Sequence, residues 1–184
     1  ETADMFDETG AGRQRFREDY GLTAQTVAIG IVGRLVPIKN HRLFIELVDY
    51  LLHTSAIKMP MRFFIVGDGE ERTKLETLLQ QKQIEFTSDD QNINEEAPVV
   101  FTSWRTDMDL VYAGLDLIVL TSLNEGTPVS VMEAMAASKP VLSARVGGIA
   151  ELFGAHENGC FFETKEELFQ LAEELVQNAQ LRYM

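Results

Sequence analysis

The amino-acid sequence predicts an α/β domain in which helices cover both faces of a doubly wound parallel sheet. Two observations carry this prediction. Short apolar runs rich in β-branched residues recur along the chain, and amphipathic segments of helical periodicity separate them. The apolar runs are nearly continuous, which is typical of strands that are covered on both faces. In such a domain helical crossovers connect the parallel strands, and we expect the ligand beyond the carboxyl ends of the strands.

The first half of the chain contains two predicted strands and three predicted helices. Residues 13–20 form a short charged helix, and residues 26–33 are an apolar run that ends at a glycine, where we expect the first buried strand. Apolar side chains then recur at helical spacing over residues 40–55. Residues 61–67 repeat the strand pattern, and residues 70–83 repeat the helical one.

A polar stretch, residues 85–96, follows the last of these helices. It carries five acidic residues and no basic one. Polar composition without apolar periodicity is typical of connecting segments. We therefore expect a solvated loop over these residues.

The second half of the chain repeats the alternation of strand and helix. The predicted strands are residues 98–103, 116–122, 140–144 and 159–162, and the predicted helices are residues 106–114, 129–138, 149–153 and 165–180. We expect a single domain over residues 26–184, because no internal repeat or linker divides them. Residues 1–25 form a lead-in segment that contains the short charged helix.

Composition and charge exclude several classes of protein. Sixteen Lys and Arg residues stand against 29 Asp and Glu residues among the 184, so the net charge is −13 and a nucleic-acid partner is not expected. Cys160 is the single cysteine, which gives no internal disulfide and favours a reducing, cytoplasmic location. No apolar run approaches the roughly 18 residues of a membrane helix, so we expect no transmembrane segment.

Two basic residues follow the first predicted strand. Arg34 and Lys39 flank a short loop, where they could bind a diphosphate through charge-assisted hydrogen bonds of about 1.5–3 kcal/mol each. They could equally be ordinary surface cations. After the second strand, Gly67 and Gly69 form a GxG turn without the further glycine of a dinucleotide fingerprint, and we interpret them as turn glycines.

The most informative segment follows the predicted strand at residues 116–122. Glu125 lies in the loop and Glu133 in the helix that begins near Pro128. The unpaired amides of the first helical turn form an anion site. The neighbours of Glu133 are apolar or small, so we expect this carboxylate to be partnered, and it could accept two hydrogen bonds from a vicinal diol such as a ribose. Glu125 is placed for a second polyhydroxylated group.

Together these segments resemble a known family. GRLVPIK, EGTPVSVMEAMAASKPV, VGGIAELF and NGCFF are similar to segments of the GT4 family of retaining glycosyltransferases, which have the GT-B fold and use nucleotide-activated sugars. The resemblance extends from about Val27 to the C-terminus. Glu125 and Glu133 match the E-x7-E signature of that family.

The resemblance implies a role for each matching position. Arg34 and Lys39 would bind the donor diphosphate, and Glu133 would hold the ribose. Glu125 would contact hydroxyls of the transferred sugar, and with Arg34 and Lys39 it makes up the catalytic set. Backbone contacts to sugar or phosphate would come from Gly126 and Thr127, and Pro128 is a further donor-binding position.

The loop after residues 98–103 corresponds to the base-binding region of that family. Ser103, Trp104 and Arg105 are therefore candidate donor-binding residues. Trp104 could stack on the base, or it could pack against the strand that precedes it.

The resemblance also implies the reaction and a second domain of the enzyme. The sugar of a nucleoside diphosphate sugar is transferred to an acceptor hydroxyl with retention of configuration, and cations aimed at the leaving diphosphate are the main catalytic device. No metal or other cofactor is expected. A GT-B enzyme has two such domains, so an N-terminal, acceptor-binding domain is the expected partner. This chain alone is expected to turn over little or nothing, and the whole enzyme could rest on a membrane face.

Two alternatives remain open from the sequence, and a third is poor. A nucleotide-sugar epimerase shares the GT-B fold, although the E-x7-E spacing favours transfer. A non-catalytic nucleotide-binding module would keep the fold without the chemistry. A dinucleotide dehydrogenase lacks support, because its glycine fingerprint is missing.

Overall fold

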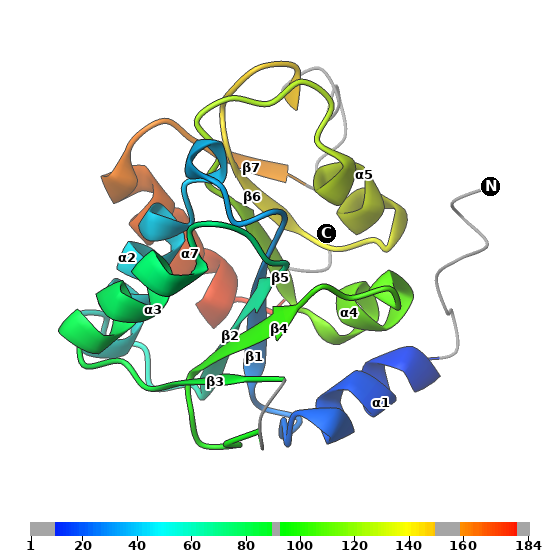
Figure 1. Cartoon of the computed structure of the whole chain (residues 1–184). Helices are drawn as coiled ribbons and strands as arrows, with labels where there is room; N and C mark the ends of the chain where they lie inside the picture. The colour runs from blue at the N-terminus through cyan, green and yellow to red at the C-terminus, as the bar shows by residue number, and fades with distance from the viewer. Residues whose placement is uncertain (1–9, 90–92, 150–158, 180–184) are drawn as a thin grey trace.

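The computed structural model describes residues 10–89, 93–149 and 159–179, and it confirms the predicted fold class (Figure 1). Seven parallel strands form one sheet in the order β3-β4-β2-β1-β5-β6-β7. The strands are β1 Val27–Val32, β2 Met61–Val66, β3 Phe86–Ser88, β4 Val99–Ser103, β5 Leu117–Leu120, β6 Val141–Ala144 and β7 Gly159–Phe162. Strands β1, β2, β4, β5 and β6 are almost entirely buried, as their continuous apolar runs predict.

Helices cover both faces of this sheet. They are α1 Ala11–Asp19, the 3-10 helix η2 Pro37–Lys39, α2 His41–His53, α3 Arg72–Gln81, α4 Met108–Gly114, α5 Val129–Ala136 and α7 Lys165–Gln177. Helices α2, α3 and α7 lie together on one face, and α1, α4 and α5 lie on the other (Figure 1). The apolar side chains accordingly form two cores, one on each side of the sheet.

The order of the strands reverses beside β1. The chain passes from β1 to β2, β3 and β4 on one side, and then to β5, which pairs with the opposite edge of β1. The segment after β1 leads to α2 on one face, whereas the segment after β5 leads to α5 on the other. A crevice opens at such a switch point, which is the ligand site of doubly wound folds. A ligand is therefore expected beside the loops after β1 and β5.

The prediction of a loop over residues 85–96 is wrong for the first part of this segment. Phe86–Ser88 form strand β3, which pairs in parallel with β4 at the edge of the sheet. Thr87 and Ser88 are buried, and the ring of Phe86 packs edge-on against Phe101 with 5.7 Å between ring centroids. A strand of three residues with two hydroxyl side chains has no periodicity that sequence could reveal. Only its partner strand identifies it.

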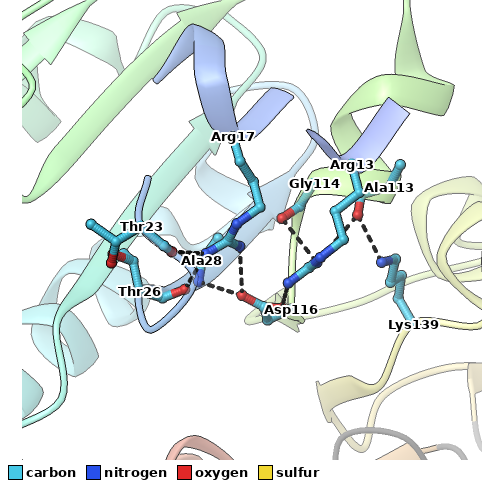
Figure 2. A network of polar contacts seen from close by, with 9 residues as sticks. All are labelled: Arg13, Arg17, Thr23, Thr26, Ala28, Ala113, Gly114, Asp116 and Lys139. Carbon is cyan, nitrogen blue, oxygen red and sulfur yellow. Dashed lines mark hydrogen bonds and ion pairs between the residues drawn. The ribbon is translucent and has the colours of Figure 1, made fainter. Parts of the chain in front are cut away.

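A buried ionic network attaches α1 to the sheet (Figure 2). Asp116, just before β5, is 5% exposed and accepts hydrogen bonds from the amide of Ala28 at 2.8 Å, from Arg13 at 2.6 Å and from Arg17 at 3.3 Å. Arg17 also donates to the carbonyl oxygens of Thr23 and Thr26. The lead-in helix is thus tied to β1 and to the start of β5.

Two further predictions concern the C-terminal part. The predicted helix at residues 149–153 lies outside the described residues except for Ile149, which is buried. Helix α7 ends at Gln177, and Thr164 and Glu167 form a capping box at its start. Across residues 10–89, 93–149 and 159–179, no helix is both long enough and apolar enough to cross a membrane.

Candidate donor-binding site

Lys39 and Glu125 meet at the switch point between β1 and β5. The ammonium nitrogen of Lys39 lies 2.6 Å from Oε1 of Glu125, and the hydroxyl of Ser122 donates to the same oxygen at 2.5 Å. Only 8% of the Glu125 side chain is exposed, against 23% for Lys39. The two candidate residues are 86 positions apart in the chain. Their contact follows from the pairing of β1 with β5, which sequence spacing could not show.

Hydrogen bonds between the two loops hold this pair in place. The amide of Leu123 donates to the carbonyl oxygen of Ile38 at 2.8 Å. The hydroxyl of Thr121 lies 3.1 Å from the carbonyl oxygen of Lys39 and 2.9 Å from that of Asn40. The backbone of Asn40 is left-handed, with φ of 50°, which asparagine tolerates better than most residues. The chain turns there from η2 into α2, so the ammonium group of Lys39 is carried on a fixed backbone.

Close backbone contacts bring three loops of the site together. A Cβ atom at Gly67 would collide with the carbonyl group of Gly33, and one at Gly69 with that of Leu35. Both glycines therefore bring the loop after β2 against the loop after β1, which confirms their interpretation as turn residues. Gly147 plays the same part against the backbone of Glu125. Sequence reasoning assigned no role to Gly147, although the VGG segment was a signal.

Arg34 differs from Lys39 in its surroundings. Its side chain is exposed, and within the described ranges it makes no hydrogen bond or ion pair. It follows Gly33 directly at the carboxyl end of β1, beside the Lys39 loop. Arg34 is therefore a cation available to an anionic ligand, while Lys39 already neutralises a carboxylate.

Glu133 is held by a tyrosine that the sequence analysis did not single out. The phenol of Tyr112, from α4, donates to Oε2 of Glu133 at 2.9 Å and lies 3.1 Å from the carbonyl oxygen of Ser130. Burial and the nearby Glu133 carboxylate raise the pKa of Tyr112 well above its ordinary value, so the phenol stays a donor. Glu133 is half-buried and partnered, as its apolar neighbours predict.

The start of α5 lies beside this pair and carries no side-chain cap. Pro128 is the N-cap residue rather than part of the first turn, and α5 begins at Val129. Gly126 and Thr127, which precede it, are exposed. Without a capping side chain, the first amides of α5 can donate to a ligand.

The remaining candidates lie at the end of β4 and in the loop after it, and their surroundings differ. Trp104 is 65% exposed, so the alternative that it packs against the strand is wrong. Arg105 instead turns into the protein, where its guanidinium contacts Asp107 at 2.7 Å and Asp89 at 3.2 Å. Ser103 has a left-handed backbone, with φ of 51°. A donor contact by any of these three residues stays a prediction.

The sequence model described as "Glycosyl transferases group 1" matches residues 26–178. The chain belongs to this family. A UDP-Gal:alpha-D-GlcNAc-diphosphoundecaprenol alpha-1,3-galactosyltransferase of Escherichia coli is 30% identical over 128 residues, which is 70% of this chain and 30% of that protein. A D-inositol 3-phosphate glycosyltransferase of Corynebacterium glutamicum is 28% identical over 154 residues, 79% of this chain and 34% of that protein. This group 1 domain thus spans about a third of the length of these relatives.

Solved structures show the same fold. Anabaena Alr3699/HepE in complex with UDP and glucose is 23% identical, with a TM-score of 0.78 over 98% of this chain and 46% of that one. The C-terminal domain of a group 1 family protein (LpcC) from Francisella tularensis gives a TM-score of 0.74 at 22% identity, over 98% of this chain and 90% of that one. The group 1 domain has the architecture of one half of a GT-B glycosyltransferase.

Proposed function

We propose that this domain binds the nucleoside diphosphate sugar of a retaining, GT4-type glycosyltransferase that transfers the sugar to an acceptor hydroxyl. The observation that carries the proposal is the Lys39–Glu125 pair at the β1–β5 switch point, 2.6 Å apart, where the fold binds ligands. The names of the relatives support it, because one uses UDP-Gal and the HepE structure contains UDP and glucose. Because the named relatives are transferases, transfer is favoured over the epimerase alternative.

In this proposal two cations and the start of α5 receive the diphosphate. Arg34 is exposed and Lys39 is partly exposed beside the uncapped helix, so all three can face one anion. Cleavage of the sugar–phosphate bond leaves negative charge on the departing diphosphate, and preorganised donors stabilise that charge. We assign this role to Arg34, Lys39 and the backbone amides of Gly126, Thr127, Val129 and Ser130, with no metal ion or other cofactor.

The two glutamates bind the sugars on either side of the diphosphate. Oε1 of Glu125 is shared by Lys39 and Ser122, which fixes a nearly buried carboxylate as an acceptor for hydroxyls of the transferred sugar. Glu133 would accept from the ribose while Tyr112 orients its carboxylate. We assign contact with the base to the loop at residues 103–105.

The acceptor site belongs to another part of the enzyme in this proposal. The chain covers about a third of its curated relatives, and we propose that an acceptor-binding N-terminal domain supplies the remainder of the cleft. The domain alone then binds donor without appreciable transfer. The proposed location is cytoplasmic, with contact to a membrane face through the whole enzyme.

Calorimetric titration of the chain with UDP, GDP and ADP tests the proposal. We expect heat of binding with at least one of the three, and weaker binding of the corresponding nucleoside, which lacks the diphosphate. A folded chain that binds none of the three would contradict the donor site. The same result would favour a non-catalytic module without a nucleotide site.

A further inference from the structure

Arg72, at the start of α3, contacts Ser103, the last residue of β4. Its Nη1 donates to the hydroxyl of Ser103 at 3.0 Å, and the amide of Gly67 donates to the carbonyl oxygen of Ser103 at 2.9 Å. The backbone of Ser103 is left-handed, a conformation that costs a serine free energy. The surroundings must therefore hold it there, and these two hydrogen bonds do so.

Arg72 is itself fixed on three sides. Its Nε donates to Glu76 at 2.7 Å, its Nη2 donates to the hydroxyl of Ser88 at 2.6 Å, and its guanidinium carbon lies 4.5 Å from the centroid of the Phe101 ring. The side chain is only 16% exposed. One arginine thus joins α3 to the carboxyl ends of β3 and β4.

The space beside Ser103 and Arg72 is open rather than packed. A cavity of about 580 Å³ borders Arg72, and its other walls are Asp68, Glu76, Phe86, Thr87, Ser88 and Ser103. Apolar packing therefore gives this side of the loop little support. Hydrogen bonds from Arg72, rather than apolar packing, therefore fix the position of Ser103.

A second arginine fixes the far end of the same loop. Arg105 pairs with Asp107 and Asp89, and its Nη1 lies 3.2 Å from the hydroxyl of Tyr20. Trp104 stands between the two anchored residues with 65% of its surface exposed. An indole that is exposed while its backbone is held on both sides is preorganised for contact with a planar group.

We propose that Arg72 is a positioning residue for the nucleoside part of the donor: by holding Ser103 it presents Trp104 to the base. This inference rests on the proposed function. Strand β4 is separated from β1 by β2 alone, so the carboxyl ends of β4 and β1 lie about 10 Å apart. That span suits a base linked through its ribose to a diphosphate held at Lys39. Stacking on an exposed aromatic ring is possible for any base, and it contributes to nucleotide affinity.

The experiment uses Trp104 as its own reporter, because it is the only tryptophan in the chain. Arg72→Ala is expected to lower the steady-state fluorescence anisotropy of the free protein, because the indole gains motion. It is also expected to raise the Kd for UDP about fivefold or more while the Kd for inorganic pyrophosphate changes less than about twofold. Arg42→Ala is the matched control, since Arg42 makes the same type of i,i+4 pair with Glu46 but on an exposed surface. It should change neither quantity.

Two variants of Ser103 separate positioning from general stability. Ser103→Gly removes the hydroxyl but adopts a left-handed backbone without strain, so its loss of UDP affinity should be smaller than that of Ser103→Ala. Ser103→Ala removes the hydroxyl and keeps the strain, so it should weaken UDP binding as Arg72→Ala does. These two variants still test the proposal if Arg72→Ala fails to fold. Circular dichroism would reveal such a failure.

Three results would overturn the proposal. One is unchanged anisotropy and UDP affinity in Arg72→Ala, a second is an equal loss of UDP and pyrophosphate binding, and a third is equal behaviour of Ser103→Gly and Ser103→Ala. Failure of the unmodified chain to bind UDP, GDP or ADP would instead overturn the proposed function and the nucleoside role together. The anisotropy of the free protein would still decide whether Arg72 positions Trp104.

Discussion

At the scale of single residues, the two basic side chains after β1 have different surroundings and therefore different consequences when removed. Lys39 lies against a nearly buried carboxylate, whereas Arg34 is exposed and makes no side-chain contact within the described ranges. Loss of Lys39 leaves Glu125 without a cation, which costs stability as well as affinity. Loss of Arg34 should affect affinity alone.

The double variant Arg34→Ala/Lys39→Ala should weaken diphosphate binding far more than nucleoside binding. Each charge-assisted hydrogen bond contributes about 1.5–3 kcal/mol, so UDP affinity should fall at least about tenfold while uridine affinity is nearly unchanged. Calorimetry with UDP, uridine and pyrophosphate measures the difference. Lys58→Ala is the control, because Lys58 is exposed and precedes β2, at the opposite end of the strands. Equal losses for UDP and uridine would contradict the assigned roles.

His41 gives a residue-scale prediction about pH. It is 3% exposed at the start of α2, and neither ring nitrogen has a hydrogen-bond partner among the residues that the structure describes. Burial, with a smaller effect of Lys39, lowers its pKa from 6.5 to about 4, while Glu71 acts in the opposite sense. Between these two pH values the unfolded chain binds a proton that the folded chain does not, so stability falls as pH is lowered.

The variant His41→Leu should remove this part of the acid sensitivity. From the two pKa values, the histidine accounts for about 3 kcal/mol of lost stability between pH 7 and pH 4. Urea unfolding at both pH values measures it. His53→Leu, at the exposed end of the same helix, should retain most of the acid sensitivity. An identical pH dependence in His41→Leu and the original chain would show that His41 does not titrate in this way.

At the scale of elements, α1 is attached by charge as well as by apolar packing. Phe16 and Tyr20 are buried in the core beneath α4, and Arg13 and Arg17 converge on Asp116 (Figure 2). Lys139 lies beside this network and donates to the carbonyl oxygen of Ala113. Burial and the nearby arginines lower its pKa to about 8. The surroundings are therefore dry enough that an unpaired charge would be costly.

Asp116→Ala should accordingly destabilise the fold by about 3–5 kcal/mol, because it leaves the nearly buried guanidinium of Arg17 without its carboxylate. Urea unfolding measures the loss, and hydrogen exchange should show the amides of α1 opening before the sheet. Lys74→Ala breaks an exposed pair with Glu71 and should have no measurable effect. If Asp116→Ala and Lys74→Ala are alike in stability, the network does not hold α1.

At the scale of the whole molecule, the fold of this acidic protein places two cations, Arg34 and Lys39, in the loop after β1. The net charge of −13 does not prevent a local anion site, because charges more than about 10 Å away are screened. Arg34 and Lys39 follow β1, and the loop that leads to α5 follows β5, the strand that pairs with β1. The fold, rather than the overall charge, therefore determines where a diphosphate could bind.

The sequence by itself determined most of the scaffold. Six of the seven strands were predictable because strands buried on both faces need continuous apolar runs, and that requirement is local. Lys39 and Glu125 were candidates for the same reason, since each stands just after such a run. Gly67 and Gly69 could be recognised as turn residues from their GxG spacing.

Only the tertiary structure decided what these residues touch. The pairing of β3 with β4, the hydrogen bond from Tyr112 to Glu133, and the contact of Gly147 with the Glu125 backbone all join segments that are distant in sequence. The exposure of Trp104 was equally undecided, because an indole beside a strand can turn either way. A local pattern reports which residues must be covered, whereas the partner that covers or contacts each one is fixed by the order of strands in the sheet and by the helices packed on its two faces.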